Sequence, residues 1–117
     1  MRLENRKFSS ISADSSNPTV MLSPSIGQEI LLTDVLVCNT TSSDKTASIF
    51  INEMNAATNA SNQNVFIVKD VLVPANTSIE IVDGQLPILN IKGLSFFDRL
   101  KGYASAAGVD VILGFRV

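Results

Sequence analysis

The feature that most constrains this chain is the period of two in its apolar residues. From residue 110 to residue 117, every second residue is large and apolar, and the residues between them include Asp110 and Arg116. Successive side chains of a strand point to opposite faces, so this alternation is typical of a strand with one face on a core. Residues 46–54 alternate in the same way, whereas residues 29–39 are almost continuously apolar, as in a strand buried on both faces over part of its length. The sequence therefore predicts an all-β protein.

Further strands are indicated by β-branched residues and by the turn residues that separate them. The predicted strands cover residues 18–22, 29–39, 46–54, 64–73, 77–82, 85–91, 99–104 and 110–117. Residues 55–63 have no clear period and are expected to form a longer exposed loop. About eight short strands at this spacing predict an antiparallel β-sandwich. A jelly-roll order and an Ig-like order of the strands fit equally well.

The first 17 residues differ from the rest of the chain. Residues 9–17 are polar and rich in serine, and they follow a short stretch of mixed charge without strand periodicity. We expect residues 1–17 to form an extended N-terminal arm, with a reach of about 50 Å, and residues 18–117 to form the sandwich. A chain of 117 residues is long enough for one such domain.

The residue types argue against catalysis. The chain has no histidine, which removes the commonest general base and the commonest metal ligand. Asp34 and Asp70 lie within apolar strands, where we expect them on a solvent face or paired with a lysine such as Lys69. Cys38 is the one cysteine, cannot form an internal disulfide and is expected to be a small buried hydrophobe. The sequence thus predicts no catalytic residue, no cofactor and no metal ligand.

Charge and hydropathy also restrict the partners. The net charge of −2 provides no overall positive field for nucleic acid. The apolar runs are far shorter than the ~18 residues of a membrane-spanning helix, and no apolar stretch follows the charged N-terminus. We therefore expect no nucleic-acid partner, no membrane partner and no secretory signal. Without such a signal, the glycosylation-like triplets at Asn39, Asn59 and Asn76 are interpreted as turn chemistry.

A few apolar and charged residues are candidates for contact with a partner. Adjacent strand residues face opposite ways, so Phe96 and Phe97 are either both buried in a bent segment or offer one ring to a partner. A sugar-binding platform would have to rest on this pair or on Tyr103, because the chain has no tryptophan. The far end of the arm combines cations with apolar residues. The candidate partner-binding residues are Arg2, Leu3, Arg6, Lys7, Phe8, Phe96 and Phe97.

Three segments carry a combination of strand ends and turns that is found in one group of proteins. They are residues 32–41 (LTDVLVCNTT), 71–79 (VLVPANTSI) and 103–111 (YASAAGVDV). Over residues 30–117 the chain resembles small β-sandwich virion proteins of tailed bacteriophages, which serve as head decoration, neck, tail or fibre components. It departs from them at residues 93–98 (GLSFFD), where the others have a short Gly-Asp turn.

The resemblance implies a non-enzymatic structural protein of a virion, made in the cytoplasm of the host bacterium. It implies a homo-oligomer, preferably a trimer, that also contacts larger virion proteins such as capsid or tail subunits. The arm is then expected to dock on a neighbouring subunit or on a larger particle protein. An alternative of another class is a sugar- or cell-surface-binding module built on the same sandwich.

Overall fold

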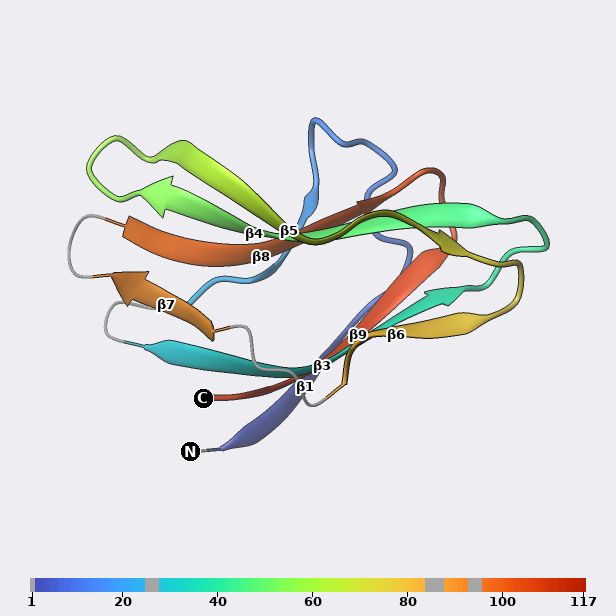
Figure 1. Ribbon diagram of the computed structural model, residues 1–117, viewed down its shortest axis with the longest axis horizontal. Helices are drawn as coiled ribbons and strands as arrows, with labels where there is room; N and C mark the ends of the chain where they lie inside the picture. The colour runs from blue at the N-terminus through green and yellow to red at the C-terminus, as the bar shows by residue number, and fades with distance from the viewer. Residues whose placement is uncertain (1, 25–27, 84–87, 93–95) are drawn as a thin grey trace.

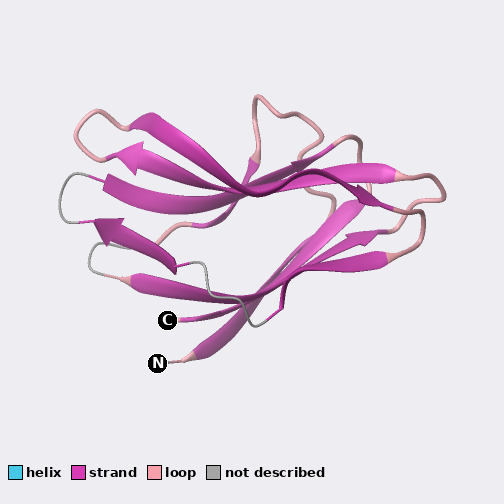
Figure 2. Ribbon diagram, viewed as in Figure 1, coloured by secondary structure: helices cyan, strands magenta, loops and turns pink. Residues whose placement is uncertain are grey.

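Strands and the turns between them make up the described part of this protein, as Figure 2 shows for the computed structural model. The structure describes residues 2–24, 28–83, 88–92 and 96–117, with the side chains of residues 83–96 left out. These residues form nine strands: β1 (Leu3–Phe8), β2 (Thr19–Leu22), β3 (Glu29–Asn39), β4 (Lys45–Asn55), β5 (Ala60–Val73), β6 (Ser78–Asp83), β7 (Ile88–Lys92), β8 (Phe96–Ala104) and β9 (Val109–Arg116). No helix in the described ranges has the length and apolar character to cross a membrane.

The strands lie in two antiparallel layers that face each other (Figure 1). Sheet A has the order β1-β9-β3-β6, and sheet B has the order β2-β8-β4-β5. Strand β7 pairs with β3 of sheet A and with β8 of sheet B, so it joins the two layers at one end. This arrangement confirms the antiparallel sandwich that the alternating sequence predicts.

The core lies between the two sheets and contains the residues that set the period of two. In β9, the inward residues Val109, Val111, Leu113 and Phe115 are at most 2% exposed. In β3, Val35 and Val37 are fully buried, whereas Leu36 and Cys38 point away from the core and are half-buried. Cys38 is therefore not the fully buried hydrophobe that its apolar run suggested. Alternation from the inward valines puts it on the outer side of sheet A.

The N-terminal arm is a correction to the sequence analysis. Leu3–Phe8 form β1, which pairs with β9 along its whole length as an edge strand of sheet A. Ile11 is 3% exposed in the core, and its N–H donates to the carbonyl of Val109 at 2.8 Å. An edge strand is held by backbone hydrogen bonds on one side and needs no apolar alternation, so side-chain periodicity could not reveal it.

The chain ends meet at this edge. The N–H of Arg2 donates to the carbonyl of Val117 at 2.9 Å, and the N–H of Val117 donates back to the carbonyl of Arg2 at 2.9 Å. Strand β9 therefore lies between β1 and β3, although it is the last strand of the sequence (Figure 1). A second difference concerns the loop expected at residues 55–63, because β5 already begins at Ala60.

Candidate interaction surfaces

The side of sheet A that faces away from the core carries most of the exposed carboxylates of the sheet. We call it the acidic face, and it is defined by Leu3, Asn5, Lys7, Glu29, Leu31, Asp34, Leu36, Cys38, Glu80, Asp110, Ile112, Gly114 and Arg116. The apolar side chains of this face differ in exposure. Leu3 is 70% and Ile112 39% exposed, whereas Leu36, which lies directly opposite Ile112 on β3, is half-buried. Neighbouring strands thus place apolar side chains between carboxylates.

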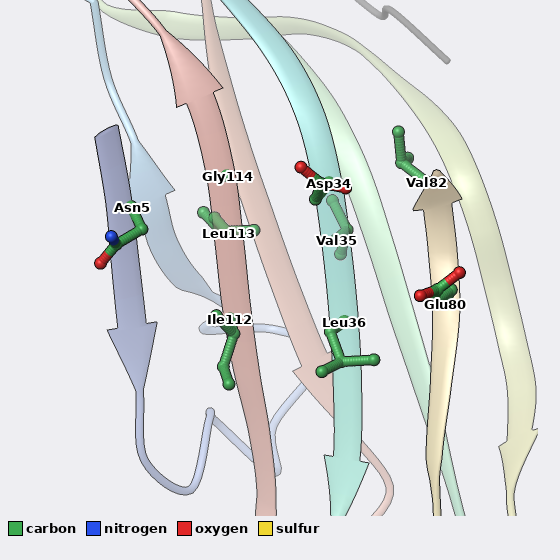
Figure 3. A pocket seen from close by; sticks show the side chains of 9 residues that line it. All are labelled: Asn5, Asp34, Val35, Leu36, Glu80, Val82, Ile112, Leu113 and Gly114. Carbon is green, nitrogen blue, oxygen red and sulfur yellow. The ribbon is translucent and has the colours of Figure 1, made fainter. Parts of the chain in front are cut away.

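A groove of about 280 Å³ runs across the middle of the acidic face (Figure 3). Asp34 stands on one side of it and Glu80 on the neighbouring strand β6, with Leu36 and Ile112 below them in the view. Gly114 keeps the groove open, because a Cβ at this position would lie 2.8 Å from Oδ2 of Asp34. The carboxylate of Asp34 accepts a hydrogen bond from the Thr33 hydroxyl at 2.9 Å.

The outer side of sheet B has a different character. We call it the basic face, and it is defined by Val20, Ser48, Phe50, Asn52, Met54, Phe66, Lys69, Asp70, Leu72, Phe97, Arg99, Lys101 and Tyr103. At its centre, Phe50 contacts Phe66 with ring centroids 5.0 Å apart and Tyr103 edge-on at 6.1 Å. Phe50 is 4% exposed, so its neighbours cover it, and Phe66 and Tyr103 present the half-exposed rings.

Three cations surround this aromatic cluster. Arg99 and Lys101 are alternate residues of β8 and therefore point to the same side, and Nζ of Lys69 lies 5.2 Å from the ring centre of Phe66. Within the described ranges, none of the three forms an ion pair with a carboxylate. The pKa of Lys101 is lowered from its usual value of 10.5, mainly by burial and secondly by the positive charge of the neighbouring Arg99.

Arg99 has weak partners for a guanidinium. Its Nη2 lies 3.5 Å from Oδ1 of Asn52 and 3.3 Å from Sδ of Met54. Its Nε is buried and has no hydrogen-bond partner among the residues that the structure describes. A buried N–H without an acceptor is unfavourable, so Arg99 is held with incomplete hydrogen bonding.

The candidate residues of the arm are placed around the outer edge of sheet A. Phe8 packs against the core, and the guanidinium of Arg6 lies 5.8 Å from the ring centre of Phe115 and donates to the carbonyl of Met21 at 3.4 Å. Arg2 forms an ion pair with Glu4. Leu3 and Lys7 are exposed on the acidic face. The structure therefore gives Arg2, Arg6 and Phe8 partners within their own chain.

The remaining predicted residues are separated rather than gathered. Phe97 is half-buried on the basic face opposite Met54, and the side chain of Phe96 lies outside the described residues. Asp34 is in sheet A and Asp70 in sheet B, so these carboxylates do not share a face. No cluster of three or more cysteine or carboxylate ligands suited to a metal ion occurs in the part of the chain that the structure describes.

The cations of β8 and the groove of sheet A were not predicted from the sequence. Residues 99–104 predict only a short strand, in which Leu100 is the one large apolar residue among the inward positions. A signal for the cations was nevertheless present in the spacing of Arg99, Lys101 and Tyr103, which puts all three on one side of a strand. The groove has no such signal, because its lining comes from several strands that are distant in the sequence.

The chain was compared with protein-family models, with curated proteins and with solved structures. No protein-family model matches the chain, and no curated protein matches it. A solved structure described as that of infectious bursal disease virus, Gx strain, is similar, with a TM-score of 0.40 and 8% sequence identity. The similarity covers 98% of this chain, which spans 37% of the length of that one.

Proposed function

We propose that this chain is a non-enzymatic structural protein of a tailed-bacteriophage virion, where it serves as capsid decoration or cement or as a neck–tail component. The observation that carries the proposal is the pair of outer faces: each side of the sandwich combines exposed apolar residues with charge, and the two charges are opposite. Surfaces of this kind are suited to assembly, because apolar contact supplies affinity and charge selects the partner.

The three segments that resemble phage virion proteins support this proposal, because they form one unit of the structure. At one end of the sandwich, the N–H of Asn39 donates to Thr77 at 2.9 Å and the N–H of Thr40 donates to Gly108 at 3.0 Å. The N–H of Asn76 donates to Thr41 at 3.0 Å. Residues that are far apart in the sequence thus act together as a single turn cluster, and the resemblance extends to a connected structural feature.

In this function the protein is made in the host cytoplasm and is incorporated in repeated copies into the particle, where it contacts copies of itself and larger capsid or tail subunits. The test is quantitative mass spectrometry of purified particles from bacteria that carry the gene, followed by a particle density map. We expect many copies per particle and density for a sandwich on its surface. Particles that lack the protein would contradict the proposal.

A sugar- or cell-surface-binding module is the second candidate, and the observation in its favour is the half-exposed Tyr103 ring beside the aromatic cluster of the basic face. Aromatic rings and nearby amides are suited to contact with sugars. A glycan array with the purified chain tests this candidate. Binding that is lost in Tyr103→Ala, together with absence from particles, would favour the module over the structural protein.

A further inference from the structure

We infer that copies of this chain associate head to tail, with the acidic face of one copy against the basic face of the next. The inference rests on the proposed function only in taking a second copy as the partner. It goes further by naming the two surfaces that meet. The two faces lie on opposite sides of the same sandwich, so a contact of this kind can repeat from copy to copy.

The charges of the two faces are complementary. On the basic face the described charged residues are Lys69, Arg99, Lys101 and one carboxylate, Asp70. On the acidic face the described carboxylates are Glu29, Asp34, Glu80 and Asp110, and the cations are Lys7 and Arg116. Each face thus has an excess of one sign. Bringing opposite faces together is favourable, and bringing like faces together is not.

The like charges of each face are also close neighbours. Arg99 and Lys101 are two residues apart on one strand, which separates them by about 7 Å. Asp34 and Glu80 both line the groove, from the paired strands β3 and β6. Each face thus presents two like charges at one place.

The apolar residues of the two faces lie beside these charges. On the basic face, Val20 is 43% exposed and is paired with Lys101, and Leu72 is 55% exposed on β5. On the acidic face, Ile112 and Leu36 line the groove below Asp34. A contact between the faces removes these side chains from water while the charges pair around them, as in the core and rim of protein interfaces.

Arg99 is the third cation of the basic face and is half-buried. Its guanidinium has no carboxylate within ion-pair distance in the described ranges. A carboxylate from a neighbouring copy would supply such a partner at the exposed part of the side chain.

The test uses charge reversal on the full chain. One variant, Asp34→Lys with Glu80→Lys, makes the acidic face basic. The other, Lys69→Glu with Lys101→Glu, makes the basic face acidic and leaves Arg99 in its contacts with Asn52 and Met54. Each variant alone then has two faces of the same sign. In an equimolar mixture, each face of one variant meets a face of opposite sign on the other.

Sedimentation velocity at low salt is the measurement. We expect the wild-type chain to form oligomers beyond a dimer, each variant alone to associate at least ~10-fold more weakly, and the mixture to recover association. Lys45→Glu changes a charge away from both faces and should behave like wild type. Thermal unfolding confirms that the variants are folded. If a variant does not fold, the single substitutions Glu80→Lys and Lys101→Glu each remove the charge excess of one face. Each alone should then associate more weakly than wild type, and wild-type association in both would overturn the inference.

The outcomes distinguish this inference from the proposed function. A mixture of folded variants that stays as weakly associated as its components would overturn head-to-tail association, even if particles contain the protein. Symmetric dimers that persist in both variants would overturn it as well. If the mixture recovers association but the protein is absent from particles, head-to-tail association is supported and the virion role is contradicted.

Discussion

Asn39 of sheet A and Val73 of sheet B are joined by a hydrogen bond across the sandwich, from Nδ2 of Asn39 to the carbonyl of Val73 at 2.9 Å. The same amide donates to the carbonyl of Ser43 at 2.8 Å, and its Oδ1 accepts from the Thr41 N–H at 3.0 Å. Asn39 is fully buried, so every polar atom of its side chain is used.

We expect Asn39→Ala to lower the free energy of unfolding by about 2–4 kcal/mol, because it leaves buried backbone groups without partners. Urea unfolding followed by circular dichroism measures the change. Asn17→Ala, which removes an exposed asparagine side chain, is the matched control and should change stability by less than about 0.5 kcal/mol. Equal stability of Asn39→Ala and wild type would show that the hydrogen bond to Val73 does not hold the sheets together.

Gly102 marks a close approach in the core. A Cβ there would lie 2.9 Å from Cδ1 of Ile49 and 3.1 Å from the carbonyl oxygen of Ser48. We expect Gly102→Ala to destabilise the fold by about 1–3 kcal/mol through overpacking. Ile49→Val removes the nearest methyl group, so the double variant should be more stable than the sum of the two single effects predicts. Additive effects in urea unfolding would contradict this coupling.

The N-terminal residues contribute to the fold in two separate steps. Deletion of residues 2–8 removes the edge strand β1, and deletion of residues 2–12 also removes Ile11 from the core. We expect the longer deletion to cost about 2–4 kcal/mol more than the shorter one, as for loss of a large core side chain. Thermal unfolding of the two deletions compares them. Unchanged stability in both would restore the view that these residues lie outside the sandwich.

Lys101 should make stability depend on pH in the alkaline range. Its pKa in the folded chain lies below 10.5, so the unfolded chain binds more protons between the two values and the free energy of unfolding rises with pH there. Lys101→Gln should therefore be more stable than wild type at neutral pH, and this advantage should be lost as the pH rises to 10.5. NMR titration of Lys101 measures the pKa directly, and Arg99→Gln should raise it. A titration at the usual value would contradict the prediction.

The sequence was most informative where side-chain pattern and strand coincide. The alternation of residues 110–117 predicted one inward face correctly, because Val111, Leu113 and Phe115 are buried in the core and Val117 packs against it. It was least informative for β1, whose pairing depends on backbone groups that carry no residue-specific signal. The acidic and basic faces could not be predicted from the sequence, because they depend on which strands pair. Asp34 and Glu80, for example, lie on neighbouring strands only because β3 pairs with β6, and the pattern of a single strand does not specify this pairing.

The position of β9 has a consequence for the order in which the protein can fold during synthesis. In sheet A, the last strand β9 lies between β1 and β3. Strand β1 therefore cannot pair until β9, about a hundred residues downstream, has been synthesised. In sheet B, β4 pairs with β5, which follows it in the sequence. This part of the sheet can therefore begin to form during translation. A nascent chain that stops before Val109 therefore has an unclosed sandwich with two unpaired strand edges on one side. Ribosome stalling or premature release before this residue would produce species prone to aggregation rather than a slightly shortened protein.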